Sequence, residues 1–194
     1  MKKTNVLPSD FHGEKYGLAY RFVNEDDAEF IVNLRTDPIK SRYISNTDAS
    51  LENQKEWIRL YKAREHDGQD YYFIFYFGST PAGVTRIYNI DDNHFIHGSW
   101  VFANNVPPFC SLAAAIIARE IAYDTLGLEE EIDTSGIHID NQGVLQVSKM
   151  MGVEFYGERE SDNGKFLLGR LSRSAFNANK KNILKLIPKK YLKL

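Results

Sequence analysis

The sequence predicts one mixed α/β domain with a single central, mostly antiparallel sheet of about six to seven strands flanked by helices. Three observations favour this fold class. Three runs rich in aromatic and β-branched residues follow one another with short turns between them. Segments with the apolar spacing of helices lie before and after these runs. The chain has 194 residues, of which 43% are hydrophobic and 13% aromatic, which is enough for one substantial core.

The first third of the chain is expected to contribute one strand and two helices. Residues 1–17 lack periodicity and are predicted to form an irregular lead-in. A strand is expected over residues 18–23. Asn24 then has the side chain of a helix N-cap, and the helix that follows is predicted to stop at Pro38. The spacing of apolar residues predicts a second helix over residues 51–66.

The middle third predicts an antiparallel meander followed by a long helix. Strands are expected over residues 71–77, 82–90 and 95–103, because turn-forming residues separate these runs at hairpin-like lengths. After the third strand, Ser111 is predicted to cap an Ala- and Ile-rich helix that continues to Leu126.

The last third is expected to add a strand, a helix and two further strands. These elements are predicted over residues 132–139, 141–151, 153–158 and 165–171. The predicted domain therefore spans residues 18–176.

The C-terminal segment, residues 177–194, is basic. It contains six lysines and no acid, so the formal charge of −2 for the whole chain divides into +6 for this segment and −8 for the rest. We expect a helix that packs its Leu/Ile face on the domain. The alternative is a basic amphipathic segment that binds anionic lipid or an acidic partner, such as a second copy of the chain in a homodimer.

Composition argues against several functional classes. A net charge of −2 gives no field that favours nucleic acid as the main partner. The single cysteine, Cys110, cannot form an internal disulfide, and no apolar run approaches the roughly 20 residues of a transmembrane segment. We therefore expect a cytoplasmic protein. The five histidines show no close ligand spacing except His94 with His97, which point to opposite faces of a strand, so no metal site is expected.

The order of the predicted elements resembles the GNAT (Gcn5-related N-acetyltransferase) superfamily from Leu18 to Leu171. Two phrases match as well: residues 21–28 resemble the family's opening strand and acidic helix cap, and residues 140–155 resemble its late helix, which begins at Asn and ends at a Gly-containing turn. The likeness is greatest to the branch that acetylates ribosomal-protein N-termini or nucleotide-linked amino sugars. It implies transfer of acetyl from acetyl-CoA to a primary amine, without a metal.

The resemblance also implies where acetyl-CoA binds. In the family, the fourth strand and the next helix hold the cofactor, which here implies the backbone of Val101, Phe102 and Ala103 and the helix start at Ser111, Leu112 and Ala113. The family's phosphate loop is Gly-rich, whereas residues 106–111 read Val-Pro-Pro-Phe-Cys-Ser. Their lack of glycine motivates an alternative, a non-catalytic relative that keeps the fold as a binding or interaction module.

A late-helix asparagine contacts the pantetheine arm or orients the thioester in the family, and Asn141 stands at this place. The alternative is that Asn141 only caps the helix. Seven residues on, where many members have a tyrosine general acid, this chain has Ser148, which is either the group that hydrogen-bonds the leaving sulfur or a helix-surface serine. His97, on the fourth strand of the family, is either the general base or a partly buried structural histidine.

The acceptor side of the family's fold is built from the two early helices and the facing strands. Arg35 and Arg42 are expected to pair with a diphosphate, with surface salt bridges as the alternative. Tyr88 and Trp100 are expected to line the acceptor cleft or to belong to its wall. The resemblance implies an amino sugar as the acceptor, in particular a nucleotide-linked one used in surface polysaccharide synthesis, with a protein N-terminal amine as the alternative.

Overall fold

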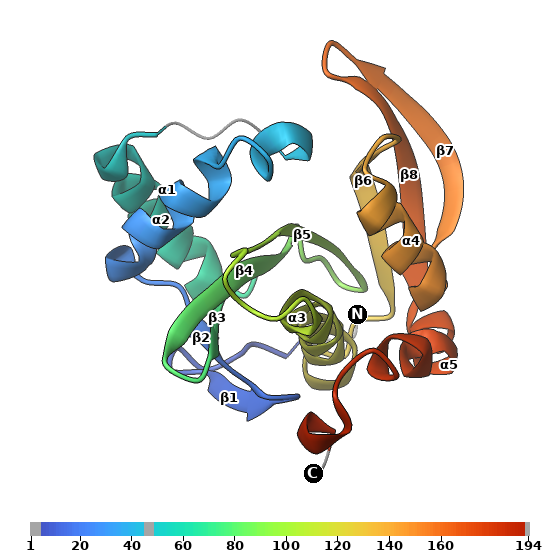
Figure 1. Ribbon diagram of the computed structural model, residues 1–194, viewed down its shortest axis with the longest axis horizontal. Helices are drawn as coiled ribbons and strands as arrows, with labels where there is room; N and C mark the ends of the chain where they lie inside the picture. The colour runs from blue at the N-terminus through green and yellow to red at the C-terminus, as the bar shows by residue number, and fades with distance from the viewer. Residues whose placement is uncertain (1–4, 45–48, 193–194) are drawn as a thin grey trace.

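The computed structural model describes residues 5–44 and 49–192. One sheet runs through the domain in the strand order β1-β2-β3-β4-β5-β6-β8-β7 (Figure 1). Its strands are β1 (His12–Lys15), β2 (Leu18–Phe22), β3 (Asp70–Phe77), β4 (Thr80–Tyr88), β5 (His94–Phe102), β6 (Glu130–His138), β7 (Glu154–Ser161) and β8 (Gly164–Ser172). Neighbouring strands are antiparallel except β5 and β6, which are parallel. The mixed α/β class and the mostly antiparallel sheet are confirmed.

Helices cover both faces of the sheet. They are α1 (Ala28–Thr36), α2 (Leu51–His66), α3 (Phe109–Glu120), α4 (Gln142–Met151) and α5 (Arg173–Leu184), and α3 continues through a π turn, η3 (Ile121–Thr125). Helices α1 and α2 lie on one face and α3 on the other (Figure 1). α3 also serves as the crossover that parallel strands β5 and β6 require.

Strand β3 shows how the two faces are filled. Alternate side chains of a strand point to opposite faces, and Tyr71, Phe73 and Phe75 join the core under α3 while Tyr72 and Ile74 join the core under α1 and α2. All five side chains are buried. The near-continuous apolar run of β3 is therefore the signature of a central strand with a core on each side.

The sheet opens between β5 and β6. In the described chain these two strands pair at His94 with Glu130 and at Phe95 with Glu131, and no pairing continues beyond Phe95. On its other edge β5 pairs with β4, with a bulge near Val84 and Ser99 in the left-handed region at φ 49°. A bulge bends the strand that carries it, so β5 diverges from β6 towards its C-terminal end.

The first correction concerns the N-terminal lead-in, in which the sequence predicted no regular element. Residues His12–Lys15 form β1 and pair with β2, which raises the strand number to eight. Tyr16 and Gly17 make a two-residue hairpin turn with φ values of 54° and 79°. Such turns need positive φ at both positions, and Gly supplies the second without strain.

Two helix boundaries also differ from the prediction. Helix α3 begins at Phe109 with Pro108 at the cap position, so Ser111 lies inside the first turn and is not the N-cap. Pro108 is suited to a helix start because its φ is already helical. Helix α5 begins at Arg173, capped by the hydroxyl of Ser172, so the predicted boundary at 176/177 falls inside a helix.

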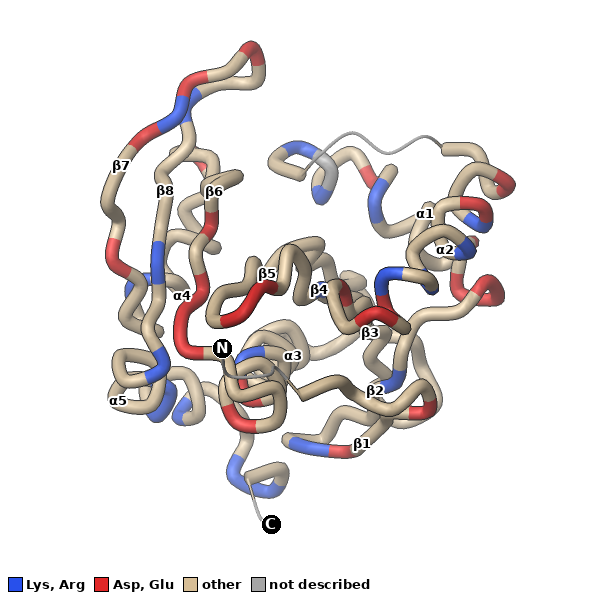
Figure 2. The backbone as a smooth tube through the Cα atoms, turned by 180° about the vertical axis from the view of Figure 1, so that it is seen from behind, with Lys and Arg blue, Asp and Glu red and all other residues tan. Residues whose placement is uncertain are grey.

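The C-terminal segment packs on the domain in its described part. Its residues Ile183 and Ile187 are buried in the core under α3, as is Phe176 just before the segment. The lysines of α5 and of the short helix η4 (Lys189–Tyr191) lie together near the C-terminus (Figure 2). In the described residues, no helix is both long and apolar enough to cross a membrane.

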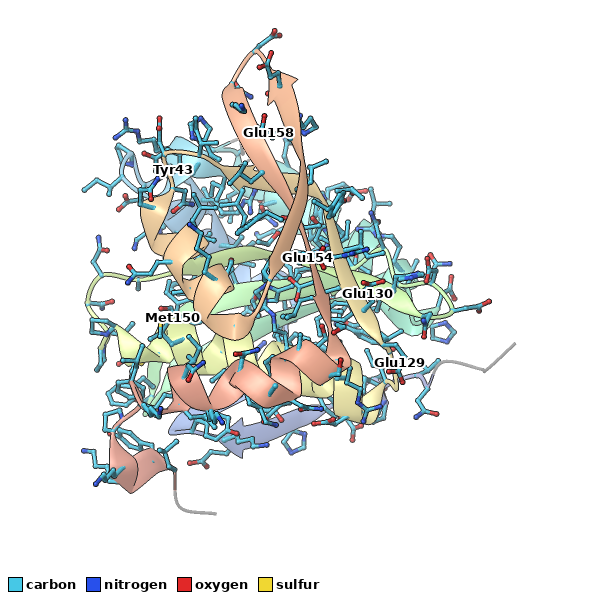
Figure 3. All side chains as sticks on the ribbon, turned by 90° about the vertical axis from the view of Figure 1, so that its right-hand side faces the viewer. Tyr43, Glu129, Glu130, Met150, Glu154 and Glu158 are labelled. Atoms are coloured by element: carbon cyan, nitrogen blue, oxygen red, sulfur yellow. The ribbon has the colours of Figure 1, made fainter. Side chains whose placement is uncertain are left out.

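Strands β7 and β8 form a long hairpin that projects past the rest of the sheet (Figures 1 and 3). The side chains of β7 are mostly exposed, including Glu154 and Glu158. The inner strand of this hairpin, β8, pairs with β6 and forms one wall of the opening between β5 and β6.

Candidate functional site

A cleft of about 640 Å³ occupies the opening between β5 and β6. Its lining comes from α1, residues 42–44, β4, β5 and α3 on one side and from β6, α4, β7 and β8 on the other. Its polar and aromatic residues include Arg35, Arg42, Tyr43, Tyr88, His97, Trp100, Arg119, Glu131, Asp133, Ser135, His138, Asn141, Ser148, Arg159 and Phe166.

A buried ion pair lies where the two strands begin to separate. Arg119 of α3 donates from Nε and Nη2 to the two carboxylate oxygens of Glu131, at 2.7 and 2.9 Å, and from Nη1 to the carbonyl of Ala115 at 3.1 Å. Both side chains are buried. This paired geometry ties α3 to β6 at the narrow end of the cleft. Burial raises the pKa of Glu131, and the neighbouring guanidinium of Arg119 opposes that shift.

His97 lies on β5 at the cleft wall. Its Nε2 is 2.7 Å from the hydroxyl of Thr85, and its ring centroid is 6.0 Å from that of Trp100. Burial, and secondarily the charge of Arg119, lowers the pKa of His97 well below its usual value. The imidazole is therefore neutral at physiological pH, and an imidazolium at this place is disfavoured.

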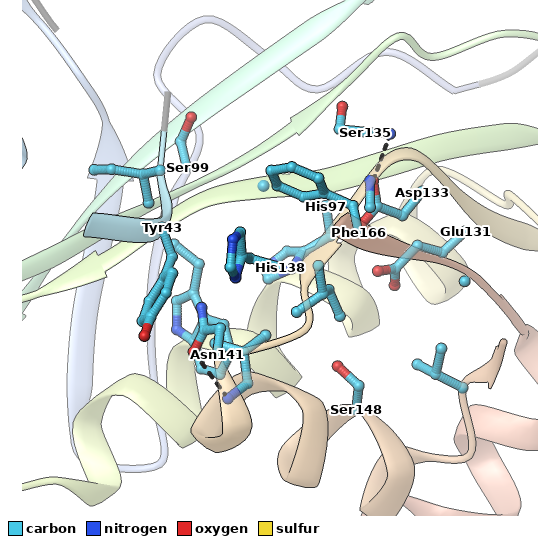
Figure 4. Close-up of a pocket in the computed structure, with 18 of the residues that line it drawn as sticks. Tyr43, His97, Ser99, Glu131, Asp133, Ser135, His138, Asn141, Ser148 and Phe166 are labelled. Carbon is cyan, nitrogen blue, oxygen red and sulfur yellow. Dashed lines mark hydrogen bonds between the residues drawn. The ribbon is translucent and has the colours of Figure 1, made fainter. Parts of the chain in front are cut away.

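Asp133 stands on β6 beside the bulge that separates its pairing with β8 into two parts. Its Oδ1 accepts the backbone N–H groups of Ser135 and Gly136, both at 2.9 Å, which is the geometry of an Asx turn (Figure 4). Burial is the main reason that the pKa of Asp133 is raised. Tyr88 of β4 interacts with the side chain of Ser135 from across the cleft, and burial raises its pKa.

Helix α4 places two of the predicted residues on the cleft. The side chain of Asn141 caps the helix, since its Oδ1 accepts the N–H of Val144 at 3.4 Å, and the residue also lines the cleft (Figure 4). Ser148, two turns along the same helix, is buried and lines the cleft as well. The interpretation of Ser148 as a helix-surface serine is therefore wrong, whereas its chemical role stays a prediction.

The loop before α3 has few backbone donors. Pro107 and Pro108 have no N–H, and the N–H of Cys110 is bonded to the carbonyl of Pro107 at 2.9 Å. The Ser111 hydroxyl donates to the carbonyl of Pro108 at 3.0 Å, while the carbonyl of Ser111 accepts the indole N–H of Trp100 at 3.0 Å. Since α3 begins at Phe109, its first-turn amides belong to residues 109–111 and not to Leu112 and Ala113 as expected.

Aromatic rings and arginines gather at the outer end of the cleft. The Tyr43 and His138 rings meet across it with centroids 5.1 Å apart, and His138 contacts Phe166 edge-on at 5.1 Å. The guanidinium of Arg159 lies over the Phe166 ring at 4.5 Å, and that of Arg42 over the Tyr43 ring at 5.2 Å. Figure 4 shows Tyr43, His138 and Phe166 around one opening.

Two further arginines of the cleft are anchored behind this rim. Arg35 hydrogen-bonds the side chain of Tyr72, which lies in the core under α1. Arg86 donates to the buried carboxylate of Asp70, with 2.6 Å from Nε to Oδ1, and stacks on Tyr88 at 4.6 Å. Their guanidinium groups are thus held at fixed places on the wall that faces β6.

The predicted site residues divide into two groups. Seven of them line the cleft: Arg35, Arg42, Tyr88, His97, Trp100, Asn141 and Ser148. Six lie outside its lining: Val101, Phe102, Ala103, Ser111, Leu112 and Ala113. The side chains of Val101 and Phe102 are buried in opposite cores, and Ala113 is fully buried, so any contact of these residues with a ligand would have to be made by the backbone.

Several residues of the cleft were not predicted from the sequence. Arg119 and Glu131 lie on different elements, α3 and β6, and nothing local marks them as partners. Asp133 had a local signal, because Asp-Thr-Ser-Gly is an Asx-turn composition within a predicted strand. His138, Arg159 and Phe166 come together through the long β7–β8 hairpin, whose pairing with β6 no local pattern specifies.

Solved structures of other proteins share the fold of this chain. Ligand-free FdhC, a nucleotide-linked sugar GNAT, is 28% identical, with a TM-score of 0.77 over 92% of this chain and 99% of that one. The ribosomal-protein-S5-alanine acetyltransferase of Vibrio fischeri is 14% identical, with a TM-score of 0.72 over 84% and 97%. Spermidine N-acetyltransferase of Vibrio cholerae, in complex with CoA and spermine, is 15% identical, with a TM-score of 0.70 over 83% and 98%.

The sequence itself gives the family. No curated protein matches the chain. The family model for the acetyltransferase (GNAT) domain matches residues 18–154, which is the span from β2 to the start of β7 and includes both strands of the opening. With this match and the open sheet between β5 and β6, the chain belongs to the GNAT acetyltransferase family.

Proposed function

We propose that the protein is an acetyl-CoA-dependent N-acetyltransferase whose acceptor is an amino sugar carried on a nucleotide. The single observation that supports this acceptor most is the composition of the cleft's outer end, where the guanidinium groups of Arg42 and Arg159 each lie over an aromatic ring. Guanidinium groups bind phosphate oxygens, and aromatic faces accept a nucleobase. The 28% identity to a nucleotide-linked sugar GNAT supports the same acceptor.

Acetyl-CoA would occupy the opening between β5 and β6. The edge of β5 that faces β6 has no ladder partner beyond Phe95 in the described chain, so its backbone groups are available to the pantetheine amides. Asn141, at the start of α4, faces this opening with its side-chain amide. These groups fit an extended, amide-containing arm.

The pyrophosphate of CoA would meet the start of α3 with a reduced set of donors. The amides of Phe109 and Ser111 remain there, since Cys110 is already bonded and the two preceding prolines have none. The helix dipole adds attraction for a negative charge. We therefore expect CoA binding that depends more on the pantetheine arm than on the phosphates.

The residues of this chain have separate tasks in the proposed reaction. A backbone N–H of β5 near the bulge at Ser99 would polarise the thioester carbonyl. Ser148, buried on the α4 side, would donate a hydrogen bond to the departing sulfur, directly or through a water. Arg35 and Arg42 would hold the acceptor's diphosphate.

A thiol-release assay tests the proposal. The protein is incubated with acetyl-CoA and a panel of amines: nucleotide-linked amino sugars, the same sugars without the nucleotide, spermidine, and peptides with free N-termini. We expect turnover with a nucleotide-linked amino sugar and a KM at least tenfold higher for the free sugar. Turnover with peptides or spermidine alone would contradict the acceptor. Absence of both turnover and CoA binding would favour the alternative of a non-catalytic module.

Arginine variants sharpen that test. Arg42→Ala is expected to raise the acceptor KM roughly 10- to 150-fold without changing that for acetyl-CoA, because one charge-assisted phosphate contact contributes about 1.5–3 kcal/mol. Arg173→Ala is the matched control, since its ion pairs with Asp124 and Glu129 lie away from the cleft lining. An equal effect of both substitutions would mean that Arg42 acts only through overall charge.

A further inference from the structure

We propose that Asp133 binds the ammonium group of the acceptor and takes its proton, acting as the general base of the reaction. The inference rests on the proposed function, since it supposes an amine acceptor in the cleft. Among the described residues that line the cleft, two are acids, Glu131 and Asp133. Glu131 has both oxygens bonded to Arg119, which leaves Asp133 as the acid available to a ligand.

The sheet register places Asp133 at the chemical centre of the cleft. Phe95 pairs with Glu131 in parallel register, and two residues further along each strand come His97 and Asp133. They therefore stand level with each other on the two walls, at the first position where the strands have separated. An acetyl group whose carbonyl is polarised by a backbone N–H near Ser99 would lie next to this level.

The hydrogen bonds of Asp133 fix one oxygen and leave the other for a ligand. Oδ1 accepts the N–H groups of Ser135 and Gly136, which orients the carboxyl group. Oδ2 accepts no hydrogen bond from any residue of the described chain. It is nevertheless not a fully buried atom, since the one fully buried side-chain nitrogen or oxygen without a hydrogen-bond partner among the described residues belongs to Glu120. It is thus open to the cleft.

Each arginine around Asp133 in the described chain has another partner, so none of them forms an ion pair with its carboxylate. Arg119 of α3 is taken up by Glu131. Arg159 of β7 donates to the carbonyl of Ser135 and covers Phe166, and Arg170 of β8 pairs with Glu154. Tyr88 of β4 interacts with Asp133, and burial raises its pKa, so it is neutral. His97 of β5, level with Asp133 in the strand register, is also neutral, because burial lowers its pKa.

This environment suits a base better at Asp133 than at His97. Burial raises the pKa of Asp133, which makes its carboxylate more basic and its unneutralised charge costly. An incoming ammonium group supplies the missing positive charge. At His97, by contrast, accepting a proton would create a buried cation beside Arg119. His97 with Thr85 is then a polar wall, and Asp133 is the catalytic residue.

The proposed reaction moves two protons of the acceptor nitrogen, one to Asp133 and one to the sulfur of CoA. One proton of the acceptor's ammonium moves from nitrogen to Oδ2, directly or through one water, and frees the nitrogen lone pair. The lone pair forms the C–N bond at the thioester carbonyl carbon, and the C–S bond breaks as the tetrahedral intermediate collapses. A second nitrogen proton passes to the departing sulfur. Asp133 then returns its proton to solvent.

Asp133→Asn is the decisive variant, because the amide oxygen can still accept both backbone N–H groups while the charge is lost. We expect kcat/KM for the acceptor to fall at least 100-fold, within the range of general-base catalysis, with CoA affinity and Tm unchanged. Asp92→Asn, at an exposed turn, is the matched control and should retain full activity. A loss below threefold in Asp133→Asn would overturn the proposal.

The pH profile separates a chemical from a structural role. In the wild type, kcat/KM should fall at low pH as Asp133 becomes protonated, with a midpoint above the usual 3.8 of an aspartate. Asp133→Asn should lack this limb and gain activity with rising pH as the amine itself deprotonates. His97→Gln should keep the fall of kcat/KM at low pH. If His97→Gln loses this fall, or if Asp133→Asn keeps it, the base is a group other than Asp133. Wild-type protein that binds CoA but acetylates no amine would instead refute the proposed function.

Discussion

Removal of the Arg119 side chain tests how the narrow end of the cleft is held together. In Arg119→Met, Glu131 keeps its buried position but loses both of its hydrogen-bond donors. Removing one partner of a buried ion pair typically costs about 3–5 kcal/mol, because the remaining charge is buried without compensation. For a chain of this length, about 1 kcal/mol corresponds to roughly 2–4 °C in Tm, so we expect a decrease of roughly 6–20 °C.

The assay is thermal and urea unfolding followed by circular dichroism, with two comparison variants. Replacing both partners, Arg119→Met with Glu131→Met, should recover most of the lost stability, because no charge is then buried. Arg173→Met breaks exposed ion pairs with Asp124 and Glu129 and should cost less than about 1 kcal/mol. A loss below about 1 kcal/mol in Arg119→Met would refute the role given to the pair.

The pH dependence of the same variant gives an independent check. Unpaired Glu131 in Arg119→Met should have a folded-state pKa raised above its unfolded value, since burial already raises it in the presence of Arg119. A group of this kind destabilises the protein above its unfolded pKa, so the deficit should grow as pH rises from about 4.5 through the folded pKa. A deficit that is instead largest at pH 4 would contradict this explanation.

Three further outcomes follow from the structure. Ser148→Ala should lower kcat about tenfold and leave the KM for acetyl-CoA unchanged, as measured by thiol release; unchanged turnover would remove Ser148 from the mechanism. Cys110 should resist alkylation in the folded protein and react after unfolding, because burial raises the pKa of its thiol to about 11, and rapid labelling at pH 8 would contradict its burial. Gly17→Val should lower Tm by several degrees, since Gly17 has φ 79° and Tyr191 packs against it. Gly127→Val is the comparison variant: Gly127 also has a positive φ but no neighbouring side chain, so it measures the effect of the backbone conformation alone.

Most of the fold could be predicted from local patterns. The three central strands and α2 have strong periodicity. Asn24 makes a cap as predicted, by accepting the N–H of Asp26, although the element it caps is the short 3-10 turn Glu25–Asp27 that leads into α1. The β1–β2 hairpin was missed because His12–Lys15 is a short edge strand whose side chains are exposed or half-buried, so it lacks apolar alternation. Its only local signal was Tyr16-Gly17, a pair compatible with a two-residue turn.

The candidate site was less predictable for a physical reason. Residues such as Asn141 and Ser148 could be placed because helical spacing fixes their relation on α4. Asp133 lies near Tyr88, and Tyr43 near His138, because of where β5 separates from β6 and how β8 bends around the cleft between them. The bulges that set this geometry, near Val84 and after Asp133, depend on pairing across strands and leave little trace in the local sequence.

The central claim is that the opening between β5 and β6 binds the CoA thioester despite a phosphate loop without glycine. Calorimetric titration of the protein with CoA tests it most directly. We expect one site per chain with a micromolar to submillimolar Kd, and at least tenfold weaker binding in Asn141→Ala, whose side chain faces the opening. No heat of binding at millimolar CoA would contradict the account.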